Sequence, residues 1–144
     1  MSALAFRNVT ASPDQDVEVW PLEAVRAALE RGGLADWRRL AGAIVRDPWG
    51  SVARQVEETL VGTRPYGVTD AFERVIAGAR ARAEAEERAA VAAEVADLIH
   101  ESGLSRAAFA SRIGTSASRL STYATGKVTP SAALLVRMRN LIRR

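Results

Sequence analysis

The sequence predicts an all-α protein, in which an N-terminal helical domain is joined by a long helix to a smaller C-terminal domain. Three observations lead to this prediction. Apolar residues recur at helical spacing through most of the first half of the chain. The stretch from Ala77 to Ala96 consists mainly of Ala, Arg and Glu, which favour helices over strands. Two short amphipathic segments near the C-terminus are separated by a turn at Gly114.

Breaks in the helical pattern set the expected domain boundaries. Residues 1–68 form an N-terminal helical domain that serves oligomerisation or partner binding, and residues 69–100 form the connecting helix. The end of that helix is also the first helix of a C-terminal domain, residues 93–144. At 144 residues, of which 48% are hydrophobic, the chain is long enough for one medium and one small domain with cores of their own.

The first 20 residues are the one place where the sequence allows β-structure. Ala5–Val9 and Val17–Trp20 are short β-prone runs on either side of Ser12-Pro13-Asp14, which is a turn signal. We therefore expect a short N-terminal β-hairpin before the helices begin.

Three helices are predicted next. The first spans Pro21–Arg31 and is stopped by two glycines, and the second spans Leu34–Arg46. The third is expected to start at Asp47-Pro48, because Asp is a good N-cap and Pro is tolerated at the first helical position, and to end near Gly62. Its predicted core residues are Val52, Val56 and Leu60.

One long helix, or two abutting helices, is expected from Ala71 to about His100, opened by a capping box that joins Asp70 and Glu73. Its Ala/Arg/Glu stretch is either a dimer seam or rigid arm, or a connecting helix with a solvated surface. The second interpretation is favoured, because the stretch has no sustained Leu or Ile heptad.

For the tryptophans and the single histidine, a structural role is favoured over a functional one. Trp20, Trp37 and Trp49 are predicted to lie in the N-terminal core, with a partner-binding surface as the alternative. His100 lies where the long helix ends, a position that favours a positive charge.

Charge is distributed unevenly along the chain. From Glu101 to Arg144 there are eight basic residues and one acid, a net charge of +7. The whole chain carries +3, so residues 1–100 carry −4. A basic C-terminal third suggests an anionic polymer as its partner, whereas the alternative is a solvated surface on an Arg-rich protein.

Composition excludes several classes of function. The chain has no Cys and one His, which removes disulfides, thiolate zinc sites and cysteine nucleophiles. We therefore expect no enzyme activity, no cofactor and no metal site. The N-terminus lacks the pattern of a secretory signal, and no apolar run approaches the about 20 residues of a membrane helix. A cytoplasmic location without a membrane partner is expected.

The segment from Leu104 to Pro130 carries the main functional signal. Ser105 is placed to cap a short helix, Arg106–Ile113, and Gly114 follows where the chain must reverse. Ser116 is placed to cap a second helix, Ala117 to about Thr125. A last helix, Ser131–Ile142, carries Leu134, Leu135, Met138 and Leu141 on one side.

A helical wheel separates the second short helix into two faces. Leu120 and Tyr123 point inward, and Arg119 lies at the edge of the outward face. That face contains no acid and no bulky apolar side chain, so it neither repels phosphate nor requires burial. Its residues are Ala117, Ser118, Ser121, Thr122 and Thr125.

Residues from about 95 to 141 resemble the phage repressor and Cro (Xre-type) helix-turn-helix family. The resemblance covers roughly a third of the chain. It rests on residues at the family's spacing: Leu104, Phe109, Ala110, Ile113, Gly114, Ser116, Leu120, Tyr123, Gly126 and Pro130.

The resemblance implies roles for particular residues. Arg106 and Lys127 fall where that family contacts phosphates, and Arg119 falls where it contacts a base or a phosphate. Ser116 is a helix cap first and a DNA contact second. The positions that read base edges are occupied by Ala117, Ser118, Ser121 and Thr122.

The chain also departs from the family pattern. Ala117 and Ser118 replace long amides, and Ala124 replaces the usual acid. Short side chains shift recognition toward thymine methyl groups, water bridges and DNA shape. Arg106, Arg112 and Lys127 also have an alternative interpretation as ordinary solvated charges.

Three functions are compatible with these features. The first is a sequence-specific transcriptional regulator, such as a repressor, which binds double-stranded DNA as a homodimer and reads the major groove with the helix 117–125. The second is an antitoxin or adaptor, whose N-terminal domain binds a protein partner while the C-terminal motif autoregulates its operon. The third is an architectural DNA-binding protein without sequence preference.

Overall fold

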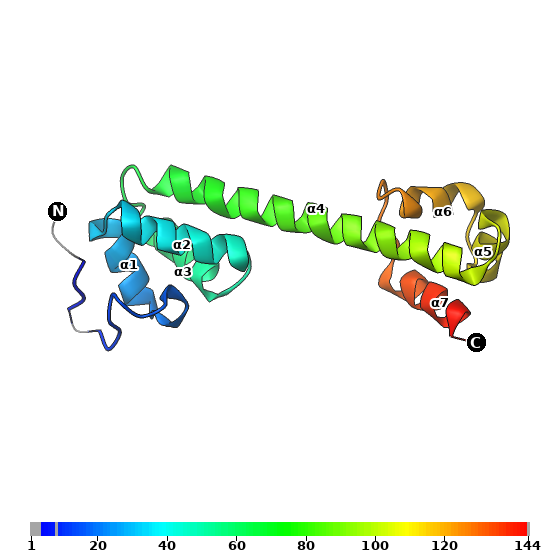
Figure 1. The fold of residues 1–144 in the computed structure, drawn as a ribbon. Coiled ribbons are helices and arrows are strands. Elements are labelled where there is room, and N and C mark those ends of the chain that lie inside the picture. Colours follow the sequence, from blue (N-terminus) through cyan, green and yellow to red (C-terminus); the bar gives the residue numbers. More distant parts are fainter. Residues whose placement is uncertain (1–3, 8, 144) are drawn as a thin grey trace. The chain divides into compact units, whose positions relative to one another are not determined.

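The computed structural model describes residues 4–7 and 9–143 (Figure 1). Within these residues the chain forms seven α-helices, one short 3-10 helix and no β-strand, so the predicted all-α class is confirmed there. Asn8 of the expected hairpin and Arg144 of the basic set lie outside the described residues. The α-helices are α1 (Leu22–Arg31), α2 (Leu34–Arg46), α3 (Ser51–Gly62), α4 (Thr69–Ser102), α5 (Arg106–Ile113), α6 (Ala117–Ala124) and α7 (Ala132–Ile142).

The expected N-terminal β-hairpin is wrong. Val17–Val19 form a 3-10 helix, η1, whose N-cap Asp16 accepts a hydrogen bond from the Glu18 amide at 3.3 Å. Val17 and Trp20 are both buried, and their spacing of three is helical rather than the spacing of two that places strand residues on one face. The Trp20 Nε1 also donates to the Ser12 carbonyl at 3.2 Å, which ties two parts of this segment together.

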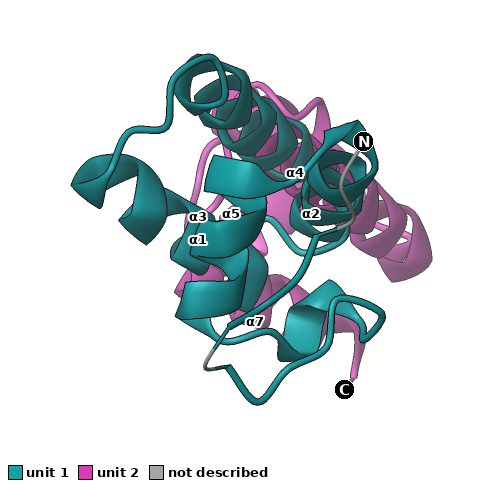
Figure 2. Cartoon of the chain, turned by 90° about the vertical axis from the view of Figure 1, so that its left-hand side faces the viewer, with its two compact units in different colours: residues 1–83 teal, residues 84–144 magenta. Residues whose placement is uncertain are grey.

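Two compact units make up the chain, residues 1–83 and residues 84–144 (Figure 2). The division falls within α4, so this single helix supplies part of each core. All seven residues from 84 to 90 are exposed, a pattern typical of a helix segment that runs through solvent. Both interpretations of this stretch stay predictions: the favoured one, a connecting helix with a solvated surface, and the alternative, a dimer seam or rigid arm.

Unit 1 packs α1, α2 and α3 with the first turns of α4. The predicted core residues of α3 are buried, as are Phe72 and Ile76 of α4. Trp20 is buried and Trp37 is half-buried, so the core prediction holds for these two. It is wrong for Trp49, which is 45% exposed in the turn between α2 and α3, where the Arg80 guanidinium carbon lies 5.9 Å from its ring centroid.

Two predicted helix starts are also wrong. The helix α3 begins at Ser51, because Asp47 and Gly50 close a turn in which the Gly50 amide donates to the Asp47 carbonyl at 3.0 Å. A Cβ on Gly50 would collide with the Asp47 side chain, which favours glycine at this position. At the start of α4, Asp70 is already the second helical residue, and Glu73 pairs with Arg64 instead of completing a capping box.

Unit 2 packs the last turns of α4 with α5, α6 and α7. Its hydrophobic core cluster draws on all four helices: Val95, Leu98, Ile99, Phe109, Ala110, Ile113, Leu120, Tyr123 and Met138. Pro130 is buried shortly before the last helix, which Ser131 caps by accepting from the Leu134 amide. Among the described residues, no helix is both long and apolar enough to cross a membrane.

Candidate nucleic-acid interface

Two helix caps and a glycine turn, all three predicted from the sequence, shape the helix α5, the turn and the helix α6. The Ser105 hydroxyl accepts from the Ala108 amide at 3.1 Å, and the Ser116 hydroxyl accepts from the Arg119 amide at 3.2 Å. Between them, Gly114 has a φ of +82° and its amide donates back to α5. A side chain in this left-handed conformation would cost about 1 kcal/mol, which explains glycine at the reversal.

The inward face of α6 holds this helix against α5. Leu120 is fully buried and Tyr123 is buried beside it, in the same cluster as Phe109 and Ile113 of α5. Ala110 of α5 is also buried, and its small side chain allows α6 to approach closely. The predicted orientation of α6 is therefore confirmed on its inner side.

The outer face of α6 lies at the protein surface. Ala117, Ser118, Arg119 and Thr125 are exposed, whereas Ser121 and Thr122 are half-buried. Ser116 is exposed at the start of the helix, and Arg106 and Lys127 are exposed on either side of it in the sequence. The eight predicted site residues thus lie on one unit, at or next to one accessible helix.

Hydrogen bonds to backbone carbonyls of α6 decide whether the outer threonine hydroxyls can donate or accept. The sequence did not predict these bonds. The Thr122 hydroxyl donates to the Arg119 carbonyl at 2.6 Å, and the Thr125 hydroxyl donates to the Ser121 carbonyl at 3.0 Å. Each hydroxyl has one hydrogen, so its oxygen remains free only as an acceptor. This favours amino groups, as on the major-groove edges of adenine and cytosine, over phosphate oxygens.

Arg106 connects the two short helices at the surface. Its Nη1 donates to the Ser121 hydroxyl oxygen at 3.2 Å, from the first residue of α5 to the middle of α6. The guanidinium has further donors for an anion, because Arg carries five N–H groups. The Ser121 hydroxyl hydrogen is left to donate outward.

Two of the arginines in the basic third are structural. The Arg137 Nη1 donates to the Ile113 carbonyl at 3.3 Å and so satisfies the C-terminal end of α5. Arg139 forms two hydrogen bonds with the Glu94 carboxylate, which lower the pKa of Glu94 and raise the pKa of Arg139. This pair joins α7 to α4 within unit 2.

The Glu94–Arg139 pair makes the stability of unit 2 dependent on pH. The pKa of Glu94 is lowered in the folded state. The pair therefore stabilises the folded state fully above the ordinary Glu pKa of about 4.3, and this stabilisation is lost as the pH falls through the lowered pKa of Glu94. Replacing Glu94 with Gln should lower the melting temperature at neutral pH, and this difference should vanish in acid. Thermal melts of both proteins across pH test this, and a difference that does not change with pH would contradict it.

A groove of about 390 Å³ runs beside α6 on the side of Arg119 and Tyr123. Its lining includes Arg119, Arg137 and Ser131, the N-cap of α7, and no acidic residue. Two guanidinium groups and a helix N-terminus create a positive potential there. Arg119 therefore lies on the side of α6 that suits an anion, next to the hydroxyl-bearing face.

Comparison of this chain with protein-family models, with curated protein sequences and with solved structures gives no match.

Proposed function

We propose that this protein is a sequence-specific regulator of transcription that binds double-stranded DNA as a homodimer and lays α6 in the major groove. The outer face of α6 is accessible and bears only small and hydroxyl side chains, and the basic residues Arg106, Arg119 and Lys127 are exposed around it. A single helix fits the major groove, and base edges there present the donors and acceptors that such side chains recognise.

The proposed contacts divide into two kinds. Ala117, Ser118, Ser121 and Thr122 face the base edges, with the Ala117 methyl suited to a thymine methyl and the Thr122 oxygen to an amino group. The cationic side chains and the cap at Ser116 face the phosphates, where they set the position and the salt dependence of binding.

Selection of bound duplexes from random-sequence DNA tests sequence-specific binding. The proposal expects an enriched consensus with two-fold symmetry, whose half-sites lie about one helical turn apart. Retention of DNA without enrichment of any sequence would favour an architectural protein instead. Failure to retain any duplex would contradict both DNA-binding functions.

Arg119 is expected to contact a phosphate, because it lies at the groove shared with Arg137 and the N-terminus of α7. Arg119→Ala should weaken binding to the selected duplex and to random duplex by the same factor, and should reduce the slope of log affinity against log salt by about one. Fluorescence anisotropy titrations at several salt concentrations measure both quantities. Arg143→Ala, which removes an equal charge beyond the end of α7, serves as the matched control. A loss of about 1–3 kcal/mol on the selected duplex alone would instead assign Arg119 to a base.

A further inference from the structure

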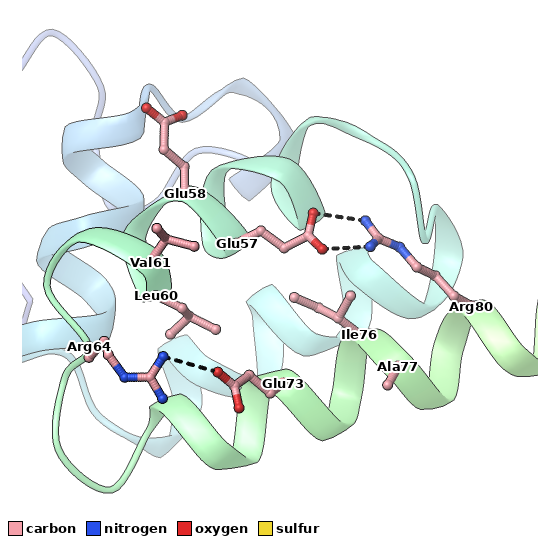
Figure 3. A pocket seen from close by; sticks show the side chains of 9 residues that line it. All are labelled: Glu57, Glu58, Leu60, Val61, Arg64, Glu73, Ile76, Ala77 and Arg80. Carbon is pink, nitrogen blue, oxygen red and sulfur yellow. Dashed lines mark hydrogen bonds and ion pairs between the residues drawn. The ribbon is translucent and has the colours of Figure 1, made fainter.

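A groove of about 600 Å³ lies on unit 1 between α3 and the first turns of α4 (Figure 3). Its apolar lining comes from Leu60 and Val61 of α3 and from Ile76 and Ala77 of α4. Leu60 and Ile76 are buried, whereas Val61 is 81% exposed. An exposed valine beside an apolar depression leaves hydrocarbon in water that a second surface could cover.

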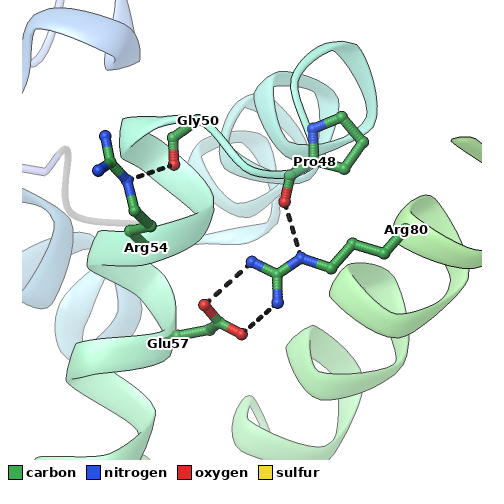
Figure 4. Close-up of polar contacts among 5 residues, drawn as sticks. All are labelled: Pro48, Gly50, Arg54, Glu57 and Arg80. Atoms are coloured by element: carbon green, nitrogen blue, oxygen red, sulfur yellow. Dashed lines mark hydrogen bonds and ion pairs between the residues drawn. The ribbon is translucent and has the colours of Figure 1, made fainter. Parts of the chain in front are cut away.

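An ion pair lies at one end of the groove. The Arg80 guanidinium on α4 forms two hydrogen bonds with the Glu57 carboxylate on α3, and its Nε donates to the Pro48 carbonyl at 2.9 Å (Figure 4). Its planar group also lies near the Trp49 ring. These contacts fix an acid on the α3 side of this end and a base on the α4 side.

The opposite end of the groove carries the reverse arrangement. Here Arg64, which follows α3, lies 3.5 Å from the carboxylate of Glu73 on α4 (Figure 3). The base is now on the α3 side and the acid on the α4 side. Arg64 has a φ of +41°, a conformation that non-glycine residues seldom adopt, so the loop holds this side chain at a cost.

Four of the five charged residues that line the groove therefore alternate around its apolar part; the fifth, Glu58, is exposed on the α3 side. A copy of the same groove, turned by 180° about an axis along its length, brings the α3 side of one copy over the α4 side of the other. Glu57 then meets Arg80, and Arg64 meets Glu73, so each of these four charges faces its opposite. The same rotation brings the exposed Val61 toward the small Ala77. An isologous dimer requires a self-complementary surface of this kind.

We propose that this groove is the homodimer interface, and that its occupant is the same groove of a second copy of the chain. The proposal supplies the two-fold axis that reading two half-sites requires, and in that respect it rests on the proposed function. The oligomeric state can nevertheless be measured without DNA. The two proposals can therefore fail separately.

Sedimentation velocity of the full chain over a range of concentrations tests the interface. The wild type should be a dimer. Val61→Glu should weaken dimerisation by about 100-fold or more, because it places a charge in an apolar contact. Val45→Glu is the matched control, since Val45 is 54% exposed on α2 and does not line the groove. Circular dichroism should show both variants folded, because each replaced side chain is largely exposed.

A charge exchange tests the arrangement itself. Arg64→Glu and Glu73→Arg should each weaken self-association, because each places like charges opposite one another. An equimolar mixture of the two variants should form heterodimers, since the carboxylate introduced in one chain then faces the guanidinium introduced in the other. A mixture that stays monomeric overturns the proposed two-fold axis. A Val61→Glu variant that dimerises as well as the wild type overturns it too.

The remaining outcomes separate the interface from DNA binding. A wild type that is monomeric at every concentration overturns the interface, even if it binds a single half-site or copurifies with a different protein. A dimer that is lost in Val61→Glu but binds no duplex supports the interface and overturns the proposed function.

Discussion

Ser118→Glu should abolish specific DNA binding while the protein stays folded, with affinity for the selected duplex reduced by at least about 100-fold. Ser118 is exposed on the outer face of α6, two residues after the cap Ser116. A carboxylate there would face phosphates and base acceptors, and a like-charge contact of this kind costs several kcal/mol. The same carboxylate is favourable for the helix, because acids stabilise the first turn.

Anisotropy titrations and thermal melts of the same samples check this prediction together. Asn140→Glu is the matched control, since it makes the same change in net charge at an exposed position of α7. It should retain most of the affinity. If Ser118→Glu binds as tightly as this control, α6 does not contact the duplex with its outer face.

Leu120→Ala, in contrast to Ser118→Glu, should lower the stability of the fold strongly. It leaves the side chains on the outer face of α6 unchanged. Leu120 lies on the inward face of α6 and is fully buried in the core of unit 2. Truncating a buried leucine costs about 2–5 kcal/mol, through lost burial and the cavity left behind. In a unit of this size each kcal/mol lowers the melting temperature by about 4–8 °C.

The distribution of aromatic residues allows this effect to be assigned to one unit. All three tryptophans lie in unit 1, so tryptophan fluorescence reports on that unit, whereas circular dichroism reports on both. Leu120→Ala should shift the circular-dichroism transition and leave the tryptophan transition in place. Val128→Ala, at an exposed position of the same unit, should shift neither. A melt of Leu120→Ala that matches the wild type would contradict the inward orientation of this residue.

Features that depend on near neighbours in the chain were predictable. The bounds of α2, the caps at Ser105 and Ser116 and the turn at Gly114 all follow from residues within a few positions of one another. Such signals act through the local backbone, because a cap or a left-handed glycine is satisfied within one turn of helix.

Features that depend on distant residues were not predictable. Asp47-Pro48 carries a good local start signal, but Gly50 closes a turn first and the Pro48 carbonyl accepts from Arg80, 32 positions away. The pairing of Glu94 with Arg139 spans 45 positions, and it neutralises one arginine of the basic C-terminal third. The alternating charges of the groove on unit 1 likewise appear only when α3 and α4 lie together.

The same distinction applies to the outer face of α6. The helical period predicts which residues lie on this face. Its exposure follows because Leu120 and Tyr123, on the opposite face, are buried. The hydrogen bonds that turn the Thr122 and Thr125 hydroxyls into acceptors depend on side-chain rotamers that no spacing rule specifies.

Interference by groove-specific base modifications measures most directly whether α6 reads the major groove. In the selected duplex, methylation of guanine N7 and adenine N6 alters the major groove, whereas inosine in place of guanine removes a minor-groove amino group. Major-groove modifications at the consensus positions should prevent binding, whereas inosine at those positions should leave the affinity largely unchanged. Loss of binding with inosine alone, or equal tolerance of all the modifications, would show that the exposed face of α6 does not enter the major groove.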